Sequence, residues 1–153
     1  MKKNYPSRLF HTVPCWIPPG EVFHIRIRCH KKNQKILTDP DVAPQLLDSV
    51  LIYQKQKKWF VHLFMIMPDH IHALVTFPPH EKMALITGNW KRYHAVNSGI
   101  LWQDNFFDHR IRNDKEYLEK AGYIRRNPAA ANLCQYADDW LWVYPKIIHG
   151  EAD

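Results

Sequence analysis

The feature that most limits the fold is a pair of apolar, β-rich runs separated by a very short break. Trp59–Met67 and Ile71–Phe77 are connected only through Pro68 and Asp69. Pro and Asp are turn-forming residues, and two β-rich runs joined by such a short connection are typical of a β-hairpin. The middle of the chain is therefore predicted to be a pair of neighbouring strands.

The segments on either side of this hairpin predict a mixed α and β domain. From 21 to 29 the residues alternate, with His24, Arg26 and Arg28 on one face and apolar residues on the other, as in a half-buried strand with a basic face. Helical spacing of apolar residues predicts helices at 41–58 and 81–97, and a short strand is expected at 106–111. The order contains two β-α-β halves, which predicts an α+β fold with a ferredoxin-like antiparallel sheet and helices on one face.

A last helix is expected to lie across this sheet. Asn113 can cap it, with Glu116 three residues later as in a capping box. The helix is predicted to end at Asn127, because Pro128 disfavours helical geometry in the residue before it. Residues 1–20 are expected to form an irregular, proline-rich arm and 129–153 a tail folded back on a single domain of 1–153.

Composition narrows the classes of partner. The chain has 153 residues, 46% of them hydrophobic, which excludes a disordered protein, and its longest apolar stretches are far below the roughly 20 residues of a membrane span. No signal peptide is visible, and the three cysteines, without a CxxC pair, fit a reduced, cytoplasmic protein. The net charge is +6, with 11 basic and 4 acidic residues in 1–60. This excess fits a polyanion such as nucleic acid, although a merely soluble basic protein has the same signature.

Two pairs of residues suggest chemistry. His70 and His72 are two apart on a strand, so both lie on one face and can converge on one divalent metal. The alternative is that both histidines are ordinary strand residues, hydrogen-bonded or exposed, which would give the same sequence pattern. Tyr123 and Asn127 are four apart on the last helix and share a face, where the amide oxygen could bind a hard cation beside the phenol. The alternative is that Tyr123 packs and Asn127 caps the helix.

The motifs around these residues resemble a known family. The segment 67–75, MPDHIHALV, resembles the MPNHxHxLV signature of single-tyrosine HUH transposases. Further blocks follow in that family's order: Trp90-Lys91-Arg92, Trp102-Gln103, Phe106-Phe107-Asp108-His109 and Tyr123-Ile124-Arg125-Arg126-Asn127-Pro128. From about residue 20 to about residue 145 the chain resembles a REP-associated tyrosine transposase, the domesticated branch of these enzymes. Asp69 departs from the more common Asn, and the proline-rich arm is unusual.

The resemblance implies a metal-dependent nuclease and strand transferase. His70, His72 and Asn127 would hold Mg²⁺ or Mn²⁺, and Tyr123 would attack the phosphorus to form a 5′-phosphotyrosine. The substrate would be single-stranded DNA beside a hairpin, and the location the bacterial cytoplasm, at the nucleoid. Candidate DNA contacts are Arg26, Arg28, Lys31, Lys32, Lys91, Arg92, Arg125 and Arg126. Trp90 and Trp102 are candidates for base stacking or for the core, and His62 and His109 are expected to be structural.

Other interpretations remain open. The chain could be an insertion-sequence transposase, in which a dimer exchanges its Tyr123 helices between two metal sites. It could also be a catalytically inactive protein that binds DNA hairpins, or a phosphoesterase that uses water while Tyr123 only packs. A monomer and a homodimer are both compatible with the sequence.

Overall fold

A computed structural model describes residues 21–146 of the chain, so the expected arm at 1–20 and the last part of the expected tail, 147–153, lie outside the described residues. The five strands form one antiparallel sheet in the order β4-β1-β3-β2-β5. The helices and strands are, in chain order, β1 (Phe23–Arg28), α2 (Ala43–Lys55), β2 (Phe60–Ile66), β3 (His70–Thr76), α3 (Met83–Ser98), β4 (Phe107–Arg110), α4 (Asp114–Ala130), a 3-10 turn η1 (Ala137–Asp139) and β5 (Val143–Tyr144).

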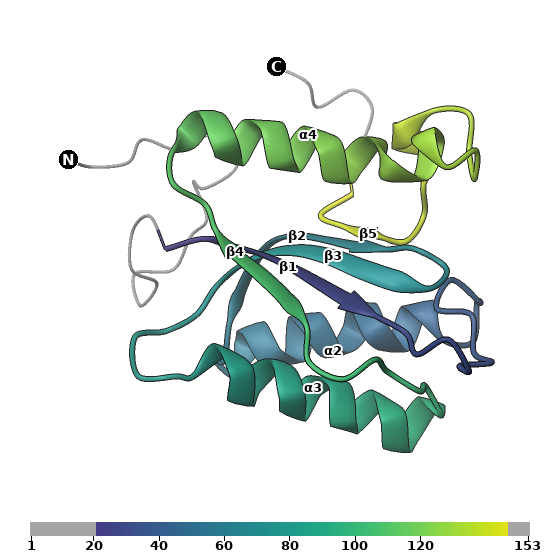
Figure 1. Ribbon diagram of the computed structural model, residues 1–153, viewed down its shortest axis with the longest axis horizontal. Coiled ribbons are helices and arrows are strands. Elements are labelled where there is room, and N and C mark those ends of the chain that lie inside the picture. The colour runs from purple at the N-terminus through teal and green to yellow at the C-terminus, as the bar shows by residue number, and fades with distance from the viewer. Residues whose placement is uncertain (1–20, 147–153) are drawn as a thin grey trace.

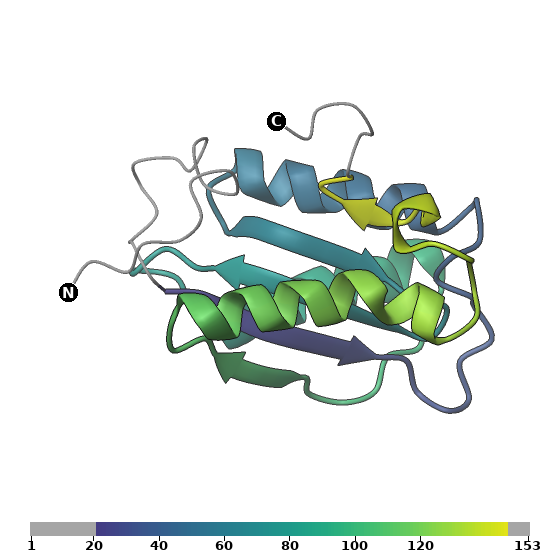
Figure 2. The same ribbon diagram turned by 90° about the horizontal axis from the view of Figure 1, so that it is seen from above.

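The helices lie on both sides of the sheet. Helices α2 and α3 cover one face, and α4 lies across the other (Figure 1). Seen from above, α4 runs along β1 and in the same direction (Figure 2). The predicted ferredoxin-like α+β sheet with a final helix across it is therefore confirmed. No helix of the described chain has the length and apolarity that a bilayer span requires.

Burial on both faces explains the strand sequences. In β3, Ile71, Ala73 and Val75 enter the core under α2 and α3, while Leu74 enters a second core under α4. All seven residues of β2 are buried, which is why this strand reads as a nearly continuous apolar run. His72 has the position in β3 that faces α4, between Arg26 of β1 and Met65 of β2.

Helix α4 begins as predicted and ends later. The Asn113 side chain accepts a hydrogen bond from the Glu116 backbone N–H at 2.9 Å, which confirms the predicted cap. The predicted end at Asn127 is wrong, because the helix continues through Pro128 to Ala130. Pro128 is buried on the same helix face as Ile124, four residues earlier. Burial of the ring in the last turn outweighs the local preference against a helix before proline.

The tail folds back and also supplies a strand that the sequence did not predict. Strand β5 pairs with β2 through Phe64 with Tyr144 and Met65 with Val143. The Trp140 indole N–H donates to the Ile66 carbonyl at 3.0 Å and fixes the preceding turn. Trp90 and Trp102 are both buried in the α2 and α3 core, so the base-stacking alternative for these two rings is wrong.

Candidate active site

The two histidines of β3 lie side by side on the face under α4. Their ring centroids are 5.0 Å apart, and Ile71 between them is buried on the opposite face, as the alternation predicts. His72 is almost fully buried, whereas the His70 side chain keeps 17% of its surface exposed. The pair therefore has one ring fixed inside the sheet and one ring at the solvent.

Each ring has its Nδ1 atom occupied by a neighbour. His70 Nδ1 lies 2.7 Å from an Asp69 carboxylate oxygen, and His72 Nδ1 lies 3.0 Å from Nε2 of His24. The Nε2 atoms remain as ligand atoms. Burial, followed by the charges of His70, His24 and the β1 arginines, lowers the pKa of His72 to about 3. His72 is therefore neutral at pH 7, which is the state in which imidazole binds a metal.

Tyr123 lies directly above this pair. Its ring centroid is 6.0 Å from that of His72, with the two planes nearly perpendicular. Tyr123 is 52% exposed, so its ring contacts His72 from the surface of α4 and is not part of the core. Tyr123 and His72 belong to the same chain, so within one chain α4 places the phenol beside the histidine pair.

Asn127 lies one helical turn beyond Tyr123, inside α4, and the helix is capped by Ala131. Asn127 therefore does not cap the helix. Helix α4 runs with β1 and thus against β3 (Figures 1 and 2), so the step from Tyr123 to Asn127 points in the direction from His72 to His70. The step is about 6 Å along the helix and about 7 Å along the strand. Asn127 is accordingly carried toward the His70 end of the pair.

The candidate donors for a divalent metal are the side chains of His70, His72 and Asn127. Within residues 21–146 no three His, Cys, Asp or Glu side chains form a metal-binding group. The amide oxygen of Asn127 is the candidate for a third protein ligand beside His70 and His72. Two imidazole rings whose Nδ1 atoms are hydrogen-bonded are suitable ligands, because the hydrogen bond on Nδ1 orients the ring and leaves Nε2 free.

A cationic groove adjoins the histidines. Arg26 pairs with His72 and Arg28 with His70 across the β1–β3 ladder, so both arginines are on the histidine face. They line a groove of about 290 Å³ together with residues 103–107. The Arg26 guanidinium carbon lies 4.9 Å from the centroid of the Phe107 ring, which is 44% exposed. Positive charge and an exposed aromatic ring thus lie beside the histidine pair.

Three more of the predicted DNA-contact residues lie near the histidine pair and Tyr123. Lys31 and Lys32 are exposed in the turn after β1, which is tied to the hairpin by a 2.9 Å hydrogen bond from Cys29 N–H to the Asp69 carbonyl. Arg126 lines a second groove, of about 330 Å³, with Tyr123 and Asn127. This leaves three cationic side chains at the end of the sheet where the phenol and the histidines meet.

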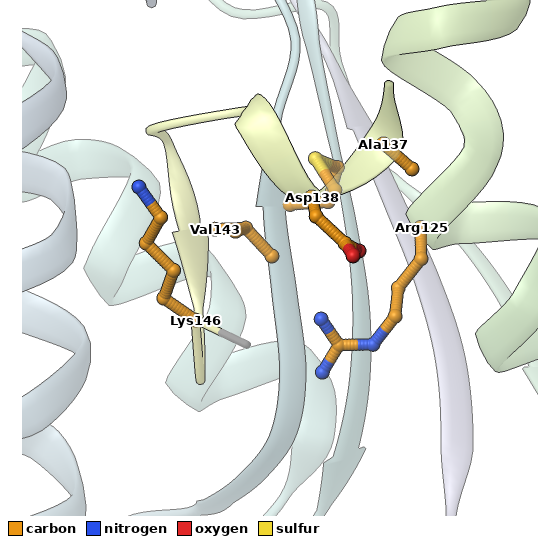
Figure 3. A pocket seen from close by; sticks show the side chains of 6 residues that line it. Arg125, Ala137, Asp138, Val143 and Lys146 are labelled. Carbon is orange, nitrogen blue, oxygen red and sulfur yellow. The ribbon is translucent and has the colours of Figure 1, made fainter. Parts of the chain in front are cut away.

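The remaining three predicted DNA-contact residues do not lie beside the histidine pair. The Lys91 ammonium donates to the carbonyls of Gln103 and Asn105, at 2.9 and 2.6 Å, and so holds the loop before β4. Arg92 is exposed on α3, on the other side of the sheet. Arg125 turns under η1 toward Asp138 and donates to the Pro145 carbonyl at 3.3 Å (Figure 3). The structure therefore does not bring Arg92 or the Arg125 guanidinium to Tyr123.

Three further histidines, His24, His62 and His109, lie in the sheet, and two of them, His62 and His109, are expected from the sequence to be structural. His62 is buried at 2.7 Å from the Thr76 hydroxyl, and His109 is 2.7 Å from a Glu116 carboxylate oxygen. His24 is the residue that sequence reasoning missed as part of the site. Its place in the alternating β1 strand put it on the same face as Arg26, but only the pairing of β1 with β3 brings it to His72.

Comparison with known proteins shows the family to which the chain belongs. A family model described as "Transposase IS200 like" matches residues 22–127. The chain belongs to the IS200-like transposase family. The match begins at Val22, before β1, and ends at Asn127 in α4. It therefore includes both histidines, the tyrosine and the amide, and it leaves out the tail with β5.

Several individual proteins are similar to this IS200-like transposase. The REP-associated tyrosine transposase of Escherichia coli (strain K12) is 24% identical, over 79% of this chain and 74% of its own length. A protein of Haemophilus influenzae described as a REP-associated tyrosine transposase is 30% identical, over 58% of this chain and 65% of its own. A solved structure of a REP-associated tyrosine transposase bound to a REP hairpin has a TM-score of 0.70 at 20% identity, covering 85% of this chain and 79% of that one. This structural likeness confirms the fold.

Proposed function

We propose that this IS200-like transposase is a metal-dependent endonuclease and strand transferase for single-stranded DNA beside hairpins, resembling the REP-associated enzymes. The observation that carries the proposal is the exposed Tyr123 phenol above His72, at 6.0 Å between ring centroids. The similar protein solved with a REP hairpin supports hairpin DNA as the substrate class. A chromosomal substrate would place the protein in the bacterial cytoplasm, at the nucleoid.

In the proposed reaction Tyr123 is the nucleophile. Its phenolic oxygen attacks the scissile phosphorus and loses its proton to solvent, a bond forms between phosphorus and the tyrosine oxygen, and the bond to the 3′ oxygen breaks. The 3′ oxygen takes up a proton and leaves as a hydroxyl, while the 5′ phosphate stays on Tyr123. Attack by another 3′-hydroxyl reverses these changes and joins a strand. Because the phosphotyrosine keeps the energy of the broken bond, no nucleotide cofactor is needed.

The neighbouring residues would prepare the phosphate for this attack. His70, His72 and Asn127 would hold Mg²⁺ or Mn²⁺, which when bound polarises a phosphate oxygen and orients the DNA. Imidazole and amide groups bind a metal in their uncharged forms, so these ligands would leave the charge of the cation available to the phosphate. Imidazole ligands suit Mn²⁺ better than Mg²⁺, which prefers oxygen.

The DNA would cross the histidine face of the sheet. Arg26 and Arg28 would contact the backbone, and Phe107 between them and the loop would stack an unpaired base. Lys31, Lys32 and Arg126 would contact phosphates around Tyr123. Lys91 would act through the loop that it holds, and Arg92 and Arg125 have no part in the proposed path.

A covalent-adduct assay tests the proposal. The purified protein is incubated with Mn²⁺ and a labelled DNA hairpin with single-stranded flanks, and the products are separated on a denaturing gel. We expect a protein–DNA adduct that disappears in Tyr123→Phe. Cleavage that survives Tyr123→Phe would establish hydrolysis by water instead, and binding without any cleavage would establish an inactive hairpin-binding protein.

A mixing experiment separates the cis site from a trans dimer. Tyr123→Phe lacks the nucleophile and His72→Ala lacks a metal ligand, so a dimer that exchanges α4 would regain one complete site when the two variants are mixed. Because α4 carries Tyr123 to His72 of its own chain, we expect the mixture to remain inactive. Recovery of the adduct in the mixture would establish the trans arrangement.

A further inference from the structure

His24 makes a contact whose chemistry goes beyond packing. It is buried in β1, with its Nε2 atom 3.0 Å from Nδ1 of His72. The two rings are stacked, with centroids 5.3 Å apart and planes 25° from parallel. The edge of the Phe107 ring closes the other side of His24, at 5.7 Å between centroids. His24 is thus held in one orientation, with its Nε2 atom directed at a candidate metal ligand.

The contact couples the tautomers of the two rings, that is, which nitrogen of each neutral ring carries the proton. A neutral imidazole carries one ring proton, so a hydrogen bond between these nitrogens needs the proton on one and the lone pair on the other. If His72 donates from Nδ1, its Nε2 atom has a free lone pair and can bind a metal. If His24 donates instead, the His72 proton is on Nε2 and blocks that lone pair. Only the arrangement in which His24 accepts gives His72 the form of a ligand.

Asp69 has the same relation to His70 that His24 has to His72. A carboxylate only accepts, so the 2.7 Å contact with Asp69 requires the proton of His70 on Nδ1. The two partners differ in solvent exposure, because the Asp69 side chain is 78% exposed and His24 only 5%. His24 is therefore a desolvated hydrogen-bond partner, and Asp69 a solvated one.

We propose that His24 is a positioning residue that holds His72 in the Nδ1–H tautomer and so presents His72 Nε2 to the metal. The inference rests on the proposed role of the histidine pair. A hydrogen-bond partner on the second nitrogen of a ligand histidine fixes its tautomer and ring orientation, and its loss costs about 10- to 100-fold in metal affinity.

Two substitutions at one position separate this role from packing. His24→Gln retains an amide oxygen near the place of Nε2 that can accept from His72 Nδ1–H, whereas His24→Leu fills similar space without an acceptor. His109→Gln is the matched control, because His109 is opposite His24 on β4 but bonds to Glu116. Thermal unfolding of each variant without metal shows whether it is folded.

The first readout is the affinity for Mn²⁺ without DNA, which electron paramagnetic resonance measures. We expect a loss of about 10- to 100-fold in His24→Leu, and values near wild type in His24→Gln and His109→Gln. Wild-type affinity in a folded His24→Leu would overturn the proposal, and so would an equal loss in a folded His24→Gln.

The second readout needs neither metal nor a variant. Long-range proton–nitrogen NMR spectra of the wild-type protein report which nitrogen of His72 carries the proton. We expect Nδ1–H, and an Nε2–H form of His72 would overturn the proposal even if His24→Leu did not fold. The function is judged separately, because a wild-type protein that forms no adduct would refute the transferase while the tautomer result stood.

Discussion

Truncation of Ile124 to alanine would test how firmly the tyrosine is held over the histidines. Helix α4 is attached to the sheet by few side chains, and the buried ones are Tyr117, Ile124 and Pro128. Ile124 is fully buried in the second core and is the residue next to Tyr123. Ile124→Ala removes apolar contact at the point where the position of the phenol is decided.

The expected cost follows from this burial. Isoleucine-to-alanine changes in cores cost about 2 to 5 kcal/mol, and the full burial of Ile124 places this one in that range. The loss falls on the docking of α4, because the other core under α2 and α3 does not include Ile124. About 3 kcal/mol changes a docking equilibrium by roughly two orders of magnitude. We therefore expect α4 to undock about a hundredfold more often, and adduct formation to fall, while the rest of the domain remains folded.

Ile86→Ala is the control, because Ile86 is buried on α3 in the opposite core. Denaturant unfolding gives the free-energy loss of each variant, hydrogen exchange of the α4 amides reports undocking, and the adduct rate is measured well below both unfolding midpoints. Ile124→Ala should expose α4 amides and slow the adduct, and Ile86→Ala should do neither. The reasoning is refuted if Ile124→Ala forms the adduct at the wild-type rate or if both variants slow it equally.

Three further outcomes are expected. Burial lowers the pKa of His94 from its ordinary 6.5 to about 4, so between those values the unfolded chain binds a proton that the folded chain does not. The free energy of unfolding should therefore fall as the pH drops from 6.5 toward 4, by up to about 1.4 kcal/mol per pH unit from this ring. Urea unfolding at pH 7 and at pH 5 should show a smaller difference between the two pH values in His94→Gln than in the wild type. Phe107→Leu should weaken binding to flanked hairpin DNA by about tenfold in fluorescence anisotropy without metal, whereas Tyr93→Leu, an exposed ring on α3, should not change it. A Cβ at Gly122 would lie 2.8 Å from the Arg126 guanidinium, so Gly122→Ala should displace Arg126 and weaken DNA binding, while helix propensity raises the free energy of unfolding by about 0.5 to 1 kcal/mol. Unchanged anisotropy would remove Arg126 from the DNA path.

Local rules were sufficient for the parts of the site that lie on one element. The shared face of His70 and His72 follows from the two-residue period of a strand and does not depend on the neighbouring strand. The cap at Asn113 likewise depends on three consecutive positions and is present as predicted. The hairpin around Pro68 also forms, and its closing bond runs from Met67 N–H to the His70 carbonyl at 2.8 Å.

Features that depend on distant residues could not be predicted in this way. His24 and His72 are 48 positions apart, and only the register of β1 on β3 makes them neighbours. Strand β5 has two residues, too few for a periodic signal, and it exists because β2 offers a free edge. Pro128 reads as the end of a helix until the buried face on which it lies is known.

The continuation of α4 beyond Asn127 strengthens the case for that residue as a metal ligand. A helix that ended at Asn127 would leave its backbone at a fraying terminus, and its amide would be used as a cap. In the structure Ala131 N–H donates to the Asn127 carbonyl at 3.0 Å, and Pro128 is packed into the domain directly after it. Asn127 therefore has a fixed backbone in the turn that α4 carries toward the His70 end of the pair, with its side-chain oxygen free of a capping role. The proline that seemed from sequence to stop the helix is thus what anchors the turn on which the proposed third ligand lies.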